Sequence, residues 1–176
     1  MRHLALAPLI ALAACATPDW RDASVPVTPA PALDLARYAG DWFEIARFPN
    51  GFEEGCRDVR TNYALRPDGL IGVTNICPVK DGGDAETAEG LARQTDDPAR
   101  LEVRFAPAWV PFAWADYTVL WTDPDYRAAV VVTPDAGLGW ILAREPDPDP
   151  ALLAEARRVL SQNGFDPDAM IYPVQR

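Results

Sequence analysis

The sequence offers few side chains that could act as nucleophiles, bases or metal ligands. Its 176 residues contain one histidine, His3, one lysine, Lys80, and three cysteines, Cys15, Cys56 and Cys77. His3 lies in a candidate export signal, and without it no imidazole remains for a Ser-His-Asp or Cys-His triad, a histidine-ligated haem or a histidine zinc site. A Schiff-base mechanism would depend on Lys80 alone.

Carboxylates are the remaining candidates for chemistry. A pair working as acid and base, as in glycoside hydrolysis, would use Glu44 or Glu89. A buried glutamate in a binding cavity more often hydrogen-bonds a ligand headgroup, so we expect no catalytic residues, no metal and no cofactor. The net charge of −10 and the sequence pI near 4.5 oppose attraction to phosphate backbones, which makes nucleic acid an unexpected partner.

The first residues predict export. Arg2 and His3 precede an apolar run, 4–14, that is too short to span a bilayer core of roughly 30 Å. The boundary Leu-Ala-Ala-Cys at 12–15 resembles the lipobox of bacterial lipoproteins, with residues 1–14 removed and Cys15 lipidated; an ordinary signal peptide that contains a cysteine is the alternative. Because Ala16 is not Asp, the pattern resembles lipoproteins of the outer membrane. Acyl chains, at about 0.8 kcal/mol per buried methylene, give stable anchoring.

Export sets the organisation of the rest of the chain. Residues 15–32, with prolines at 18, 26, 29 and 31, are predicted to be the lipidated cysteine and a flexible tether, and residues 33–176 a single domain in the periplasm. In an oxidising compartment the two remaining cysteines, Cys56 and Cys77, more often form a disulfide than a metal site.

Eight short strands follow at regular spacing, separated by turn sequences rich in Gly, Pro and Asp. The predicted strands are 41–48, 57–65, 70–77, 85–93, 101–106, 115–122, 127–133 and 138–144. They favour an all-β fold, an eight-stranded antiparallel up-and-down β-barrel, because closure removes exposed edges; a sandwich is the alternative. A hairpin about Pro67 and Asp68 would bring Cys56 within about one pair of Cys77, in reach of a disulfide.

One C-terminal α-helix is predicted after the strands. Asp149 can cap it with Pro150 in the first turn, apolar residues repeat at helical spacing, and Gly164 ends it. We expect this helix to pack outside the barrel, and residues 165–174 to return as an extended segment along the wall.

Three stretches then resemble the lipocalin family. YAGDWFEIARF at 38–48 looks like the Gly-x-Trp signature, DPDYRAAVV at 123–131 like the turn between the sixth and seventh strands, and WILAREP at 140–146 like the last strand. The resemblance, to bacterial outer-membrane and apolipoprotein D-like members, covers residues 33–176. It implies that Gly40, Trp42 and Arg144 close the barrel, with the arginine lying across the indole, which contributes on the order of 1 kcal/mol.

The resemblance also implies an interior that binds a hydrophobic ligand. Pocket positions are matched by Tyr38, Tyr63, Asn75 and Trp140. One face of strand 115–122 adds Tyr117 and Trp121, and the predicted mouth or wall adds Glu89, Phe105, Trp109 and Trp114. Glu44 is a further ligand-binding candidate, as a glutamate that would hydrogen-bond a headgroup. Each aromatic residue has core or wall packing as its alternative. The apolar loop 106–113 has no evident core to fill, and could meet membrane lipid, a homodimer partner or the entering ligand.

These observations together predict a membrane-anchored lipocalin that binds, stores or transports a fatty acid or lysophospholipid in the cell envelope. The alternatives are an envelope interaction protein whose barrel is filled by side chains, and a lipocalin-fold enzyme.

Overall fold

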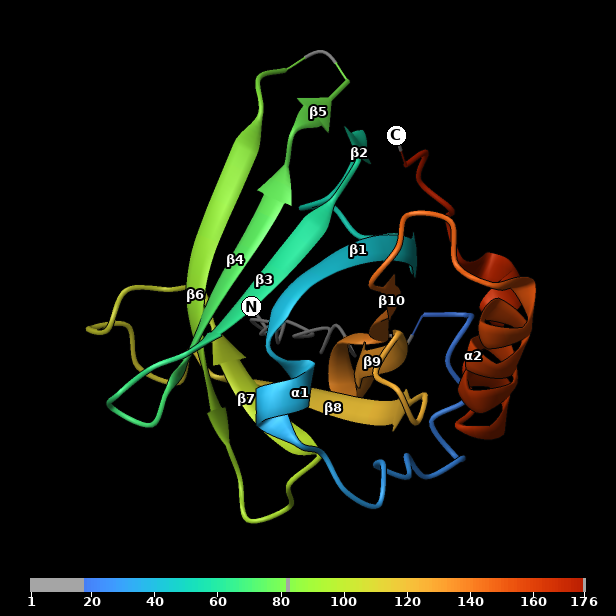
Figure 1. The fold of residues 1–176 in the computed structure, drawn as a ribbon, viewed down its shortest axis with the longest axis horizontal. Coiled ribbons are helices and arrows are strands. Elements are labelled where there is room, and N and C mark those ends of the chain that lie inside the picture. The colour runs from blue at the N-terminus through green and yellow to red at the C-terminus, as the bar shows by residue number, and fades with distance from the viewer. Residues whose placement is uncertain (1–17, 82, 176) are drawn as a thin grey trace, which may run out of the picture.

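The computed structural model describes residues 18–81 and 83–175, so the predicted signal peptide and Cys15 lie outside the described residues. Eight antiparallel strands close into a barrel in the order β1-β10-β9-β8-β7-β6-β4-β3, which confirms the predicted barrel over the sandwich (Figure 1). These strands are β1 (Gly40–Arg47), β3 (Arg60–Leu65), β4 (Ile71–Cys77), β6 (Glu86–Gln94), β7 (Arg100–Arg104), β8 (Ala115–Thr122), β9 (Ala128–Thr133) and β10 (Leu138–Ala143).

The predicted strand 57–65 is interrupted. Its first part is the short strand β2 (Cys56–Arg57), which pairs with β5 (Val79–Lys80) in a separate two-stranded sheet. Asp58 has a φ of 56°, in the left-handed region, and this turns the chain out of the strand before β3 begins. Two-residue strands are too short to produce a hydrophobic period, so the sequence did not predict the second sheet.

Apolar side chains form two layers separated by the barrel wall. One fills the barrel interior, and the other lies between the barrel and α2 (Pro150–Gln162), which packs outside as predicted (Figure 1). All six residues of β9 are buried, because this strand has the interior on one face and α2 on the other. Asp149 caps α2 by accepting from the backbone N–H of Ala151, as the sequence predicts.

The side chain of Trp121 does not point to the predicted face of the strand, because β8 contains a β-bulge. The register of β8 against β9 shifts between Val119 and Trp121, so these two side chains no longer share a face. Val119 packs in the barrel interior, whereas Trp121 packs with the layer under α2. Trp121 therefore lies outside the cavity for which it was proposed.

The described part of the predicted tether is also different from expectation, because residues 18–32 lie on the barrel. The Trp20 indole N–H donates to the Gly137 carbonyl at 2.8 Å, and its ring stacks on Phe48 with centroids 6.0 Å apart. Farther along, the backbone N–H of Ala30 donates to the carbonyl of Val119. Gly137 permits the close approach: a Cβ there would fall 2.6 Å from Pro18, and its φ is +63°. The composition indicated flexibility, but the aromatic and backbone contacts fix the segment.

Short helices and the tail complete the fold. The barrel is preceded by α1 (Leu35–Tyr38), and η1 (Pro134–Ala136) and η2 (Pro167–Ala169) are single 3₁₀ turns. The predicted extended segment 165–174 is interrupted by η2, and the chain runs along the wall beyond it, where Ile171 and Arg47 exchange both backbone hydrogen bonds. Within 18–81 and 83–175 no helix is long and apolar enough to cross a membrane.

Candidate functional site

A cavity of about 410 Å³ occupies the part of the barrel interior that the core leaves unfilled. Its volume lies within the range of roughly 300–1,000 Å³ that is typical of small-molecule sites. Phe52 and Phe105, exposed by 58% and 45%, mark the end where it opens to solvent. The described lining is mostly apolar and consists of Phe52, Glu53, Thr61, Tyr63, Val73, Asn75, Ala88, Val103, Phe105, Ala115, Tyr117, Val131, Thr133, Leu138, Trp140 and Leu142.

Three tyrosines form the deep end of this interior. The hydroxyl of Tyr117 lies 3.0 Å from that of Tyr38 and 2.6 Å from that of Tyr63, so Tyr117 links the other two hydroxyls by hydrogen bonds. All three are buried, and desolvation raises the pKa of each phenol, that of Tyr63 to about 12. The deep end therefore presents neutral rings and internally paired hydroxyls to the cavity.

Below the tyrosines, Trp42 and Arg144 close the barrel. Trp42 is fully buried, and its indole N–H donates to the Tyr38 carbonyl at 2.8 Å. The guanidinium carbon of Arg144 lies 3.8 Å from the centre of the Trp42 ring. Gly40, with a φ of +96°, lets the chain turn into β1 at this point, and a Cβ there would lie 3.4 Å from Arg144. The three residues therefore have the arrangement that the family resemblance implies.

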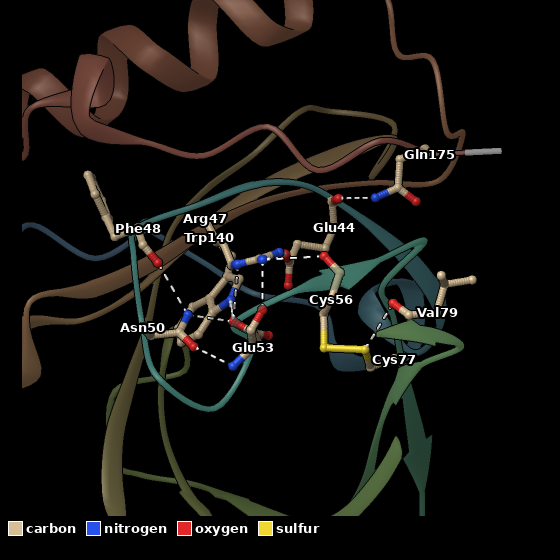
Figure 2. A network of polar contacts seen from close by, with 10 residues as sticks. All are labelled: Glu44, Arg47, Phe48, Asn50, Glu53, Cys56, Cys77, Val79, Trp140 and Gln175. Carbon is tan, nitrogen blue, oxygen red and sulfur yellow. Dashed lines mark hydrogen bonds and ion pairs between the residues drawn. A yellow bond between two sulfur atoms is a disulfide. The ribbon is translucent and has the colours of Figure 1, made fainter. Parts of the chain in front are cut away.

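A buried polar network lies at the other end (Figure 2). The Arg47 guanidinium is 2.6 Å from the Glu44 carboxylate and 4.0 Å from that of Glu53. In a regular strand residues i and i+3 point to opposite faces, and the β-bulge between Glu44 and Ala46 allows Glu44 and Arg47 to meet. Glu53 also accepts from the Asn50 amide at 2.6 Å and from the Trp140 indole at 3.1 Å.

One guanidinium serves two carboxylates in this network. Burial and the charge of Glu53 raise the pKa of Glu44 to about 8, against the opposing effect of Arg47. Burial thus favours the protonated form of Glu44, which reduces the charge that the network holds away from water.

The disulfide lies beside this network. Cys56 on β2 and Cys77 at the end of β4 are joined, with their Cα atoms 5.5 Å apart, as the hairpin register predicts (Figure 2). The Cys56 carbonyl also accepts from Arg47 at 3.4 Å. The bond therefore connects the second sheet to the barrel next to the charged residues.

The predicted ligand residues separate into two groups. The cavity wall contains Tyr63, Asn75, Phe105, Tyr117 and Trp140. The other six residues are outside the described lining: Tyr38, Glu44, Glu89, Trp109, Trp114 and Trp121.

Each of these six has a distinct environment. Tyr38 lies in the core below the cavity and Glu44 in the buried network. Glu89 is an exposed residue of β6, and β3 and β4 separate β6 from β1, which carries Glu44. Trp109 is 82% exposed, and the guanidinium groups of Arg93 and Arg104 each lie over the ring of Trp114, 4.4 Å and 4.7 Å from its centre.

Glu53 is the principal residue of the cavity that sequence reasoning missed. It lies in the loop between β1 and β2, where no strand period assigns a direction to its side chain. The one available signal was the neighbourhood of Phe52 and Cys56, which ties the loop to the barrel. Among the residues with described placement, no group of three or more His, Cys, Asp or Glu is arranged to hold a metal ion.

A closed antiparallel barrel with a sealed floor, an apolar cavity and a few polar groups at its mouth defines a small-ligand-binding protein. The chain belongs to the lipocalin family: the family model described as a lipocalin-like domain matches residues 33–175.

Similar proteins agree with this assignment. The chain is 38% identical over 145 residues to outer membrane lipoprotein Blc of Escherichia coli, covering 81% of this chain and 80% of the relative. It is 32% identical to apolipoprotein D of Mus musculus over 146 residues, or 78% and 75% of the two chains. The solved structure of the cockroach allergen Per a 4 has the same fold, with a TM-score of 0.66, 24% identity and coverage of 88% and 97%.

Proposed function

We propose that this protein is an outer-membrane lipocalin that holds one single-chain lipid, a fatty acid or lysophospholipid, in its barrel. The observation that carries the proposal is the cavity of about 410 Å³, which is lined mainly by apolar side chains with a few polar ones among them. Such a cavity suits an amphiphile with one acyl chain. The similarity to outer membrane lipoprotein Blc supports the location, with the domain in the periplasm.

Tryptophan fluorescence tests binding directly. Trp140 lines the cavity, whereas Trp109 is 82% exposed on the loop after β7. A lysophospholipid with a dibrominated acyl chain should quench the wild-type protein saturably at about one site per chain. Trp140→Phe should remove most of that quenching and Trp109→Phe should leave it unchanged. Equal loss in both variants, or no saturable quenching, would contradict the proposal.

Lipidation of Cys15 is the second part of the proposal. Cells that express the full chain should incorporate radioactive palmitate into it, and Cys15→Ser should abolish the label and release the protein from the membrane fraction. Cleavage after another residue, with an unlabelled product, would instead indicate an ordinary signal peptide.

One observation favours an additional interaction. Trp109 and Phe112 are 82% and 101% exposed on the loop between β7 and β8, at the same end as Phe52 and Phe105. Exposed aromatic pairs mark contact surfaces, and we propose that a second copy of the chain covers this one. Light scattering should report a dimer for the wild type and a monomer for Trp109→Ser with Phe112→Ser. A wild-type monomer would refute it.

A further inference from the structure

Two Asn-Gly pairs occur in the chain, Asn50 with Gly51 and Asn163 with Gly164. In such a pair the glycine nitrogen can attack the asparagine side chain, because glycine has no side chain to hinder the approach. Asn50 and Gly51 lie in the loop between β1 and β2, whereas Asn163 is the buried C-cap of α2. The same dipeptide can therefore be compared in two settings within one molecule.

The attacking nitrogen is accessible at Gly51 and restrained at Gly164. Gly51 is exposed, and its backbone N–H has no hydrogen-bond partner among the residues with described placement. A Cβ at Gly51 would meet no atom of a non-neighbouring residue within 4 Å, so the loop has space to move. The N–H of Gly164 instead donates to the Ser161 carbonyl at 3.1 Å, and a Cβ there would lie 2.6 Å from Arg21. The fold therefore permits attack by Gly51 and opposes attack by Gly164.

The side-chain amide of Asn50 contacts two groups that can assist this reaction, both from Glu53 (Figure 2). Its Oδ1 accepts from the Glu53 backbone N–H at 2.9 Å, which stabilises the negative charge that develops on this oxygen during attack. Its Nδ2 donates to the Glu53 carboxylate at 2.6 Å, and this carboxylate can relay a proton to the departing nitrogen. The Nδ2 of Asn163 donates to the Val159 carbonyl, which cannot relay a proton.

We propose that Asn50 is a site of spontaneous deamidation, and that its conversion to an acidic residue loosens the loop 48–55. The Gly51 nitrogen loses its proton to water and bonds to Cγ of Asn50, and Nδ2 takes up a proton and leaves as ammonia. Water then opens the five-membered imide at either carbonyl, which gives aspartate or isoaspartate. Each conversion consumes a water molecule and releases an ammonium ion, with no oxidation or reduction. The inference is independent of the ligand proposed for the cavity.

The new carboxylate would disturb the buried network. The amide that it replaces now donates to Glu53 at 2.6 Å and to the Phe48 carbonyl at 3.2 Å. Two carboxylates at such a distance repel each other, and Arg47 already serves both Glu44 and Glu53. The contacts that hold Glu53 against position 50 would therefore be lost, and the loop would open more often to solvent.

Peptide mapping tests the modification. The full chain, purified in detergent, would be incubated at pH 7.4 and 37 °C, digested at acidic pH, where ring closure is slow, and analysed by mass spectrometry. Deamidation should accumulate at Asn50 and be at least about tenfold slower at Asn163. Gly51→Ala should slow the reaction at Asn50 about tenfold, because the methyl group hinders attack, and the φ of Gly51 is not positive, so alanine fits. An unmodified Asn50, or equal rates at the two asparagines, would overturn the proposal.

Unfolding the chain separates the effect of the fold from that of the local sequence. In guanidinium chloride both dipeptides are exposed, so Asn50 and Asn163 should deamidate at similar rates. A difference that persists in the unfolded chain would not come from the contacts of Gly51 and Glu53, and would contradict the inference.

Asn50→Asp tests the consequence, since aspartate is one of the two products. Chymotrypsin should cleave this variant after Phe52, which is 58% exposed, at least about fivefold faster than the wild type. Asn62→Asp is the matched control, because the Asn62 amide also donates to a carboxylate, that of Asp41 at 2.7 Å, but lies on β3. The control should be cleaved at the wild-type rate, and a wild-type rate in Asn50→Asp would refute the loosened loop.

A second measurement applies if Asn50→Asp does not fold. The deamidated fraction of the incubated wild type carries an additional negative charge and can be separated by anion exchange. It should be cleaved after Phe52 faster than the unmodified fraction, and equal rates would refute the proposed consequence.

Discussion

The guanidinium of Arg144 lies against the face of Trp42, 3.8 Å from its ring centre, and also donates to five backbone carbonyls. Four of these carbonyls belong to Arg37, Tyr38, Ala39 and Asp41, and the fifth belongs to Tyr126. One side chain at the end of β10 therefore holds the whole connection between α1 and β1. Since the first and last strands of the barrel meet here, the contact closes the barrel floor as well as the sheet.

Both the charge of Arg144 and the several N–H donors of its guanidinium should stabilise the barrel. Arg144→Ala loses the cation above the indole and leaves several carbonyls without donors, which should lower the free energy of unfolding by about 3 kcal/mol. Arg144→Lys keeps a cation but cannot donate to the same set of carbonyls. Its free energy of unfolding should therefore lie between those of the wild type and Arg144→Ala. Urea denaturation followed by circular dichroism measures both, and wild-type stability in the alanine variant would contradict the closure role.

The buried pair of carboxylates predicts an unusual pH dependence. The pKa of Glu44 is raised from 4.5 to about 8 in the folded protein, so between these values the folded state holds a proton that the unfolded chain has released. The stabilisation that protonated Glu44 provides is greatest below pH 4.5. It declines as the pH rises toward 8, with a slope of at most about 1.4 kcal/mol per pH unit, and levels off at higher pH. The urea concentration at the midpoint of unfolding should fall for the wild type as the pH is raised from 5.5 to 7 and 8.5. It should change less over the same range for Glu44→Gln. Equal slopes for both proteins would exclude Glu44 as the source.

Reduction of the disulfide should loosen the mouth of the cavity and leave the floor intact. The bond between Cys56 and Cys77 spans 21 residues, and a closed loop of that size typically contributes about 3 kcal/mol. A double Cys56→Ser, Cys77→Ser variant should melt at lower temperature, and amide exchange should increase most in β2 and β5. Faster exchange at Trp42 rather than at β2 would place the effect elsewhere.

Residues 18–32, which pack on the barrel, should contribute to folding stability. Trp20 is partly buried against Phe48 and bonded to the Gly137 carbonyl. Trp20→Ala should cost about 2 kcal/mol, less than a fully buried tryptophan, and should expose the bond after Arg21 to trypsin. Ser24→Ala, in the same segment but exposed, is the matched control. Equal trypsin sensitivity in both variants would contradict the docking.

The barrel itself was predictable because alternating strands, turn residues and ordered motifs all indicate the same closed sheet. The sequence also identified the cap at Asp149 and the pairing of Cys56 with Cys77, since both depend on local spacing. The face of Trp121 was not predictable, because a bulge that shifts one residue leaves no mark in the hydrophobic pattern.

The candidate site was harder to predict for a related reason. Wall positions such as Tyr63 and Tyr117 follow strand parity, whereas Glu53 is held in a loop by Asn50 and Trp140, which are distant from each other in sequence. The structure of the predicted tether was hard to predict for a similar reason. Proline content indicated an extended chain, but residues 18–25 form turns closed by the backbone bonds from Arg21 to Pro18 and from Val25 to Asp22. Composition also carries no information about whether such a chain adheres to the barrel.

Because residues 18–32 pack on the barrel, only a short length of chain connects the barrel to any lipid on Cys15. Two residues, Ala16 and Thr17, lie between Cys15 and Pro18. A fully extended chain covers at most about 3.6 Å per residue, so these three steps place the two Cα atoms within roughly 11 Å of each other. Since Pro18 lies against Gly137, the lipid would keep the barrel at the membrane surface. With Cys15 lipidated as proposed, the barrel would take up and return a bound lipid at that one bilayer rather than carry it across the space between two membranes.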